Sequence, residues 1–552
     1  MANLRTRFIS ICFFSLCLST LVAGQAITGG RILLIPMDDR PPCLQFPVRM
    51  GMIGDATIVT PPKDLLGRFT TPGQSDRIIS WLKAQNMRSF DAAIVSLDMV
   101  AYGGLVAMRR HGDTSVSQAL ARLDVLRELK QKNPRLPIYV QSVIMRLAPT
   151  GDGKNESYRD KLSQWAELSP YPESSASTTR LEREIPADVL DDYKRARKRD
   201  LEVNLKAIEL VRDRVIDYLI LSQDDAKPKG IHVADRESLL FETNRLGLRN
   251  KIAIQPGADE VAMLLLARAL NKKFKTSPRI KAIYSSAQLK NKVMPYEDRA
   301  LSETVSFHIK ATGSREVESE KDADILFYVY ASRYEPGRAI SFADEIDNKI
   351  EQGSRVIVAD IDPKGDVQGG DLSFTRELER RALLAELNSY ASWNTAGNTI
   401  GTTLPQGVIF ALATAKLMRS KDASDRIWTA QNWFTFHRVL DDYYYHNEVR
   451  AKAREFILKN KWTTVRLSDE ATRTVEDFSS SLMLTAFESL SRSYFALRKT
   501  SRQRNVRCEG PRKMSFDLPW NRTFEAEIDF DLKCWRFRER LADPRGTHGS
   551  KR

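Results

Sequence analysis

The chain has 552 residues, of which 85 are lysine or arginine and 71 are aspartate or glutamate, so its formal charge is +14. Hydrophobic residues make up 42% and charged residues 28%, which is typical of globular proteins and excludes a mainly disordered chain, a collagen-like fibre and a multi-span membrane protein. The length predicts about two to four structural units, or one large α/β barrel with additions.

Residues 1–26 are predicted to form an export signal. Two arginines give it a basic start, residues 8–23 are apolar, and Gly24 and Ala26 are the small residues that a cleavage site requires. A single membrane anchor is the alternative, but the apolar stretch is shorter than the ~20 residues that a span needs. We therefore expect an exported protein, periplasmic or secreted, with no membrane span left after cleavage.

Cleavage would leave three cysteines, Cys43, Cys508 and Cys534. Because an exported protein meets an oxidising environment, we expect a disulfide between Cys508 and Cys534, which share one C-terminal segment, and a free, buried Cys43. We also expect this segment to lie outside the functional site, so that losing the disulfide costs stability more than activity.

Short β-rich runs alternate with helical stretches after the signal. This alternation predicts an α/β fold with a mostly parallel sheet, in the form of a (β/α) barrel or a barrel-like core, across residues 27–422. The predicted strands cover residues 31–36, 57–60, 92–97, 137–145, 218–221, 251–255, 325–330 and 355–359.

The pattern changes at about residue 423. Residues 428–458 and 469–497 have the periodicity of amphipathic helices with many aromatic side chains, and residues 504–541 contain alternating runs. We therefore predict that residues 423–552 form a C-terminal helical region with a small, disulfide-linked β segment.

Carboxylates follow five of the predicted strands. In parallel sheets and barrels the loops at the carboxyl ends of strands build the binding site, so we expect these acids to converge. A single acid after a strand is usually a helix cap, but five such positions, two of them Asp-Asp pairs, exceed what capping requires. The candidate binding residues at these strand ends, with two neighbours, are Asp38, Asp39, Arg40, Asp98, Tyr102, Asp224, Asp225, Asp259, Glu260 and Asp360.

Adjacent aspartates such as Asp224 and Asp225 have two chemical uses. Paired like charges raise one pKa, so one carboxyl can hold a proton while the other is ionised, which suits acid catalysis on a glycosidic bond. The same oxygens suit a divalent metal ion. Both uses remain open from the residues alone.

Residues 391–401 form a second candidate segment. Trp393, Asn394 and Asn398 combine an indole face with two amides, the mixture that sugar sites use to cover a ring and bond its hydroxyls. An ordinary tight loop with a structural tryptophan explains the segment equally well.

Several motifs are absent from the sequence. It has no HExxH or paired-cysteine motif, no GxSxG, no P-loop and no GxGxxG after the first predicted strand, so we predict no cofactor and assign no metal ligands. Its basic residues are scattered, and the densest run, residues 194–198, has the pattern of a solvated helix face. We therefore expect a carbohydrate partner, such as an acidic envelope polysaccharide, and no nucleic acid.

Five motifs resemble a bacterial family that is catalogued as a domain of unknown function. The resemblance covers nearly the whole chain after the signal and implies one architecture throughout, without implying an activity. The motifs are IPMDDRP at residues 35–41, PPKDLLG at 61–67, SLDMVAYGGL at 96–105, WNTAGNT at 393–399 and LPWNRTFE at 518–525.

The Asp224–Asp225 pair, with Asn394 far downstream, is also similar to the layout of barrel hexosaminidases that remove N-acetylglucosamine. This resemblance implies that Asp224 orients the acetamido group of the substrate as an internal nucleophile, that Asp225 is the acid/base and that Asn394 binds the sugar. The later sugar-binding loop of those hexosaminidases carries an aspartate, and this chain has Asn398 near that place.

These observations lead to one expected function and two alternatives. We expect an exported carbohydrate-active hydrolase in which Asp225 and Asp224 are catalytic, while Asp98 and Tyr102 bond sugar hydroxyls. The alternatives are a divalent-metal-dependent hydrolase of phosphate or amide bonds, and a non-catalytic envelope protein that binds sugar.

Overall fold

The computed structural model describes residues 28–332, 335, 337–362, 369–496 and 506–536. The predicted export signal, residues 1–26, lies outside the described residues. Within the described ranges, none of the helices combines the length and the apolar character that crossing a membrane demands.

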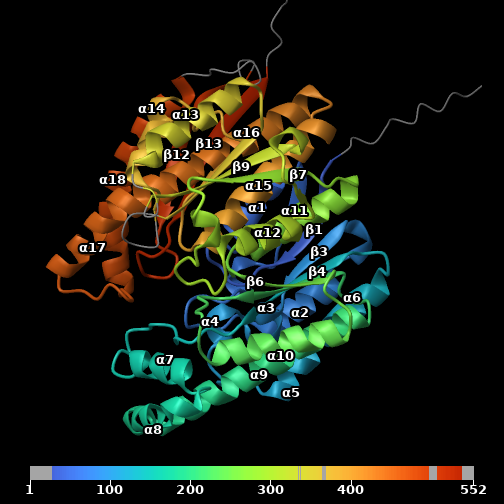
Figure 1. Ribbon diagram of the computed structural model, residues 1–552, viewed down its shortest axis with the longest axis vertical. Helices are drawn as coiled ribbons and strands as arrows, with labels where there is room; N and C mark the ends of the chain where they lie inside the picture. The colour runs from blue at the N-terminus through green and yellow to red at the C-terminus, as the bar shows by residue number, and fades with distance from the viewer. Residues whose placement is uncertain (1–27, 333–334, 336, 363–368, 497–505, 537–552) are drawn as a thin grey trace, which may run out of the picture.

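The first parallel sheet contains β1 (Gly30–Ile35), β2 (Ala56–Val59), β3 (Ala92–Ser96), β4 (Ile138–Ile144), β5 (Tyr218–Gln223) and β6 (Ile252–Pro256). The second contains β7 (Arg279–Tyr284), β8 (Arg315–Glu316), β9 (Ile325–Ala331), β10 (Val356–Asp362) and β11 (Ser389–Ala391). Their strand orders are β2-β1-β3-β4-β5-β6 and β11-β10-β9-β7-β8, with every pairing parallel (Figure 1).

The predicted α/β class and mostly parallel pairing are confirmed, but the strands form two open sheets and not a barrel. A barrel closes when its first strand pairs with its last. Here β1 already lies between β2 and β3, and the strand that follows β6 in the chain starts the second sheet. The carboxyl ends of the first six strands therefore share one edge of a single sheet.

Two apolar helices join the sheets. α11 (Val261–Phe274) packs on β3 and β4, α15 (Ala396–Lys416) packs on β9, β10 and β11, and the two helices pack on each other. Residues 261–267 of α11 and 396–413 of α15 are all buried, as expected for helices that are apolar on every side. Figure 1 shows both helices between the sheets, together with α1 (Gln45–Ile53) and α12 (Leu301–Ala311).

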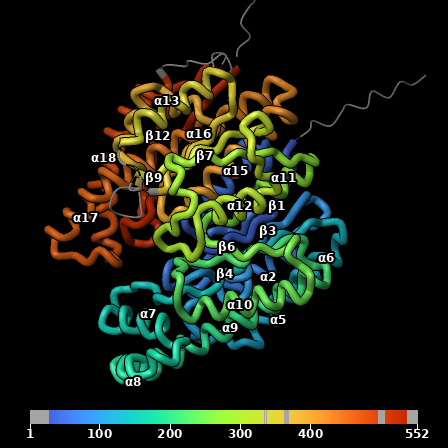
Figure 2. Tube along the Cα trace, viewed as in Figure 1, coloured from blue at the N-terminus to red at the C-terminus, as the bar shows by residue number. Residues whose placement is uncertain are grey.

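The remaining helices cover the outer faces. The long helix α9 packs on β4 and β5, and α7 and α8 lie at the end of the molecule that is farthest from the second sheet (Figure 2). The helices of the first part are α2 (Ser75–Ala84), α3 (Leu97–Tyr102), α4 (Leu105–Met108), α5 (Val116–Arg122), α6 (Asp124–Lys132), α7 (Arg159–Leu168), α8 (Ser175–Glu184), α9 (Ala187–Arg212) and α10 (Ile231–Arg245). Those beside the second sheet are α13 (Arg338–Glu351) and α14 (Leu372–Arg380).

The C-terminal part is helical with a small antiparallel hairpin, as predicted. It contains α16 (Lys421–Arg438), the π-helix η7 (Val439–Val449), α17 (Arg450–Lys459), α18 (Asp469–Ala496), β12 (Val506–Asp517) and β13 (Glu527–Arg536). Cys508 and Cys534 face each other across the hairpin and form the predicted disulfide, and Cys43 is free and buried, also as predicted. Because β13 packs against α16, the hairpin is fixed to the body of the molecule.

Candidate active site

A pocket of about 510 Å³ lies at the carboxyl ends of the first sheet. Loops after β1, β4, β5 and β6 form one side, and α7, α17 and the turn between β12 and β13 form the others. Five of the residues predicted from the sequence line it: Arg40, Asp224, Asp225, Asp259 and Asn394.

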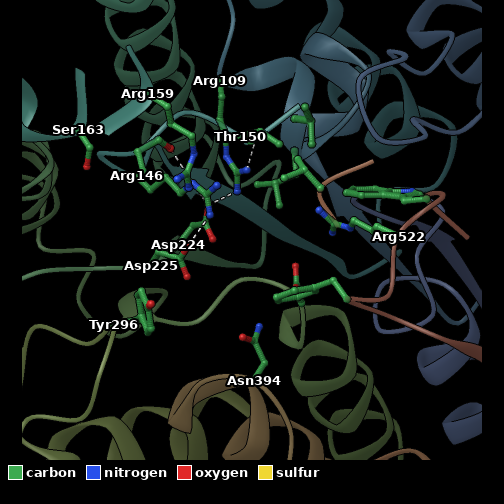
Figure 3. Close-up of a pocket in the computed structure, with 18 of the residues that line it drawn as sticks. Arg109, Arg146, Thr150, Arg159, Ser163, Asp224, Asp225, Tyr296, Asn394 and Arg522 are labelled. Carbon is green, nitrogen blue, oxygen red and sulfur yellow. Dashed lines mark hydrogen bonds and ion pairs between the residues drawn. The ribbon is translucent and has the colours of Figure 1, made fainter. Parts of the chain in front are cut away.

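The two aspartates after β5 each contact an arginine. Arg109 donates to Asp224 and Arg146 donates to Asp225, as the dashed lines in Figure 3 mark. Thr150 accepts a hydrogen bond from Arg109 at 2.6 Å, which fixes that guanidinium. The Asp224 side chain is 11% exposed and that of Asp225 is 34% exposed, so Asp225 is the more accessible acid.

The environment shifts the two carboxyl pKa values in opposite directions. Burial alone would raise the pKa of Asp224, but Arg109 and Arg146 together outweigh it and lower that pKa below its ordinary value. Burial raises the pKa of Asp225; Arg146 opposes this rise, and the charge of Asp224 adds to it. Asp225 therefore keeps its proton to a higher pH than Asp224 does.

Three pocket residues have a left-handed backbone. Asp225, Tyr296 and Asn394 have φ angles of +43°, +62° and +55°. Figure 3 shows Tyr296 and Asn394 on the opposite side of the pocket from the guanidinium groups of Arg109 and Arg146. Tyrosine is seldom found in this conformation, and such strain persists mainly at functional sites.

Arg40 ties three parts of the chain together at the base of the pocket. Its Nη2 donates to Asp38 and to Asp259, both at 2.7 Å, and its Nη1 donates to Glu525 at 3.2 Å. Its guanidinium also lies 4.6 Å from the ring centre of Trp520. Asp38 thus positions Arg40, while burial raises the pKa of Asp259 to about 7 against the opposing charge of Arg40.

The turn between β12 and β13 lines the pocket, which corrects the expectation that the disulfide-linked segment lies outside the site. Trp520, Arg522, Thr523 and Phe524 all face the cavity. Trp520 Nε1 donates to Asp39 Oδ1 at 2.6 Å, so this bond holds the turn against the end of β1. The hairpin reaches the site because its strands run from the disulfide toward the first sheet.

Asp98 and Tyr102 do not reach the pocket surface, although they follow β3 at the same sheet edge. Asp98 is fully buried and accepts hydrogen bonds from the Val143 amide and the Ser96 hydroxyl, at 3.4 and 3.3 Å. Tyr102 is 4% exposed, and its ring packs under Arg199. Burial under the following helices, and not the position of the strand, keeps both from contacting a ligand in this pocket.

The residues predicted around the second segment have supporting positions. Trp393 is 5% exposed, packs edge-on against Phe46, and donates to Thr402 at 3.0 Å, so its face is not open to a sugar ring. Asn394 donates to Asn398 at 2.9 Å. In turn, Asn398 donates to Glu260 at 2.7 Å, so this chain of bonds positions Asn394.

Asp360 lies apart from the pocket because β10 belongs to the second sheet. Its carboxylate accepts a hydrogen bond from the Asp371 amide at 2.5 Å, at the start of α14. Of the predicted acids, Asp224, Asp225 and Asp259 of the first sheet line the pocket, and Asp360 does not join them.

The main feature that the sequence analysis missed is a set of basic residues. Arg146 lies two residues after the end of β4, and Arg522 lies inside the motif LPWNRTFE, so the sequence could have indicated both positions. Nothing in the sequence singled out the arginines on helices. The basic residues that line the pocket besides Arg40 are Arg109, Arg146, Arg159, Lys227, Arg450, Arg454 and Arg522.

Metal-ligating side chains are not grouped in the described residues. Within those ranges no three His, Cys, Asp or Glu side chains are placed to hold one ion. The pocket aspartates instead contact arginines, which would compete with any cation for the same oxygens.

The sequence matches the model of a protein family of unknown function, DUF4127, over residues 32–529. The chain belongs to this family. The match confirms the resemblance to a domain of unknown function, and no curated protein matches the chain. The DUF4127 region runs from β1 into β13, so it includes every residue that lines the pocket, the basic set and the hairpin turn included.

Proposed function

We propose that this protein is a carbohydrate-active hydrolase that cleaves glycosidic bonds in the pocket at the carboxyl ends of the first sheet. The observation that carries the proposal is the Asp224–Asp225 pair, in which the more accessible carboxyl has the raised pKa and its neighbour the lowered one. A carboxyl that keeps its proton can protonate the leaving oxygen of a glycoside, which is typically worth ~10²–10⁴ in rate.

The roles of the neighbours follow from their places around Asp225. Asp224 keeps a charge that can stabilise the positive ring carbon of the transition state, or orient an acetamido group if the substrate carries one. Tyr296 and Asn394 lie opposite the arginines, where they can contact the sugar ring. Asp259 is a second pocket carboxyl with a raised pKa.

The metal-dependent alternative is less well supported, because it would require a cation to displace arginines from the same carboxylates. The sugar-binding alternative does not account for the raised pKa of Asp225, because a pure binder needs no such acid. It is one outcome of the test below.

The test is turnover of a panel of aryl glycosides, with and without a chelator. N-acetylglucosaminides and the matching glucosides belong in the panel, because only the former allow acetamido assistance. Asp225→Asn should lower turnover by about 10²–10⁴-fold. Asp235→Asn is the matched control, because Asp235 is also partly buried and paired with an arginine, Arg197 at 2.6 Å, but does not line the pocket.

Equal activity in Asp225→Asn and the wild type would remove this residue from the mechanism. Activity that the chelator abolishes and a divalent ion restores would favour the metal-dependent alternative. Specific sugar binding without turnover of any substrate would favour the binding protein.

We also propose that the protein is exported, to the periplasm or outside the cell. The predicted signal and the Cys508–Cys534 disulfide support this, since disulfides persist in oxidising compartments. N-terminal sequencing of protein made in its host tests the proposal: a start near Ile27 is expected, and an intact Met1 on reduced cytoplasmic protein would contradict it.

A further inference from the structure

The pocket wall that carries Tyr296 and Asn394 is held by a network of buried polar side chains. Two members of the network lie on α12, which packs on β6 and α15 (Figure 1). Buried polar groups are unfavourable unless they bond one another, and a bonded network fixes the side chains around it. Its members, each at most 4% exposed, are Glu260, Glu297, Thr304, His308 and Asn398.

Glu260 is the centre of one branch. Its Oε2 accepts hydrogen bonds from Asn398 at 2.7 Å and from the Ala258 amide at 3.0 Å. Its Oε1 lies 3.4 Å from His308 Nε2. Asn398 in turn accepts the bond from Asn394. Three side-chain contacts therefore join His308 to a residue that lines the pocket.

His308 and Glu260 must share a proton. His308 Nδ1 lies 2.8 Å from the Thr304 carbonyl oxygen, which can only accept, so Nδ1 carries a hydrogen. If Nε2 and the Glu260 carboxylate both lacked a proton, two acceptors would face each other in a fully buried place. One proton therefore lies on Nε2 or on Glu260, and the contact is attractive in either form.

Glu297 is the centre of the other branch and directly follows Tyr296 in the chain. Its Oε1 accepts from the Gly397 amide at 2.8 Å, and its Oε2 accepts from the Thr304 hydroxyl at 3.2 Å. Thr304 and His308 are four residues apart on α12, so they lie on the same face of this helix. One face of α12 thus holds both branches.

Two glycines leave room for the Glu260 side chain. A Cβ at Gly257 would lie 1.9 Å from Glu260 Oε1, and one at Gly401 would lie 2.1 Å from Glu260 Cγ. Gly401 is inside α15, where glycine is less favourable than alanine. The close approach of Glu260 explains a glycine at this helix position.

We propose that α12 supports this wall of the pocket and that His308 is the positioning residue through which it holds Asn394. This inference rests on the proposed function, in which Asn394 contacts the sugar ring. His308 is fully buried and is not part of the pocket lining, so its effect on the substrate is indirect. Its loss should raise KM and change kcat little, because Asp225 keeps its arginine.

Two substitutions separate the two bonds of His308. The amide of asparagine can replace Nδ1 and keep the bond to the Thr304 carbonyl, whereas the longer glutamine can place its amide at Nε2 and keep the bond to Glu260. His308→Asn should raise KM about tenfold on the best glycoside, the usual effect of losing a hydrogen bond to a charged group. His308→Gln should stay close to the wild type.

A second measurement needs no activity. Hydrogen exchange of the Ala258 amide and of residues 397–399 reports on the Glu260 branch. His308→Asn should speed exchange there about tenfold and leave β4 and β5 unchanged. Val305→Ala is the matched control, because Val305 is equally buried on the same helix and its side chain has no polar atom.

Thr304→Val tests the other branch and decides the matter if His308→Asn fails to fold. Valine has nearly the shape of threonine, so the variant loses only the hydroxyl that donates to Glu297. Exchange of the Gly397 amide should become faster, because this amide donates to the same carboxylate. An unchanged rate in that variant would overturn the support of the wall by α12.

Unchanged KM and exchange in His308→Asn would overturn the positioning role, and so would equal defects in His308→Gln or in Val305→Ala. If the wild type turns over a glycoside, that result would leave the hydrolase in place. Faster exchange in His308→Asn alone, without turnover of any glycoside by the wild type, would reject the hydrolase and keep the hold of α12 on the pocket wall.

Discussion

Trp520 Nε1 donates a hydrogen bond to Asp39 Oδ1 at 2.6 Å, joining residues that lie 481 positions apart in the chain. Both side chains are buried, at 3% and 4% exposure. Burial raises the pKa of Asp39 to about 6, and the bond from Trp520 opposes that rise. The contact therefore stabilises the charged carboxylate and fixes the hairpin turn over the pocket at the same time.

Trp520→Phe should lower the free energy of unfolding by about 1–3 kcal/mol, because the Asp39 carboxylate loses a buried donor. Chemical denaturation measures the change. Trp428→Phe is a matched control: Trp428 is also buried, and its Nε1 has no hydrogen-bond partner in the described part of the chain. If both variants lose the same free energy of unfolding, the loss comes from the smaller side-chain volume and not from the hydrogen bond.

Asp224→Asn should move the alkaline limb of the pH–activity profile to lower pH. The charge of Asp224 raises the pKa of Asp225, so its removal leaves Arg146 and Arg109 to lower that pKa. An acid catalyst works only while protonated, and activity is then lost earlier as the pH rises. The profile of kcat/KM against pH on the best glycoside measures this, and a limb that stays in place would mean that Asp225 is not the titrating acid.

Asp98→Asn should stabilise the protein more at pH 8 than at pH 5. Burial raises the pKa of Asp98 from 3.8 to about 7, so between these values the folded state holds a proton that the unfolded chain releases. Stability therefore falls as the pH rises through this range, and asparagine removes the penalty. Urea unfolding of the variant and the wild type at pH 5 and pH 8 measures the stabilisation at each pH. If Asp98 is ionised in the folded protein at both pH values, the stabilisation should be the same at both.

Replacing Cys508 and Cys534 with alanine should cost about 3 kcal/mol of stability, the usual value for a ring of this size. The bridged residues are 26 positions apart. Because the hairpin turn lines the pocket, we now also expect a higher KM. A reductant should reproduce both effects in the wild type and change nothing in the double variant; an unchanged KM would restore the view that the segment is only structural.

Tyr296→Gly should raise stability by about 1 kcal/mol, since glycine adopts the left-handed backbone at position 296 without the steric penalty of a side chain. It should also lower activity, because the ring faces the substrate space. Lys275→Gly is the matched control, as Lys275 is exposed, has a φ of +53° and lies outside the pocket. Thermal unfolding and turnover are measured for both; equal activities would exclude a role for the Tyr296 ring.

The sequence allowed the fold class and the acidic edge of the first sheet to be predicted, because both depend on local patterns. Strands followed by acids are visible in a linear sequence, and parallel pairing brings their ends together. The division into two sheets was not visible, since each β-run looks the same whichever sheet it joins. Asp360 was therefore grouped with acids that belong to the other sheet.

Burial and long-range pairing could not be read from the sequence. Trp393 has the composition of a sugar platform, yet Phe46 covers its side. Arg450 and Arg454 on α17 follow helical spacing like any solvated face, and only the tertiary fold places them in the lining of the pocket. Asp98 was expected at the surface because nothing local distinguishes it from Asp225.

The hairpin turn that completes the pocket has a consequence for the order of events during biosynthesis. The aspartates after β5 emerge from the ribosome some 300 residues before Trp520 and Arg522, at positions 225 and 520. Contacts this distant in the chain form late, because they carry a large loop-closure entropy. A growing or still unfolded chain therefore lacks the wall that the hairpin turn supplies, so the pocket is complete only after the last strand pair has closed.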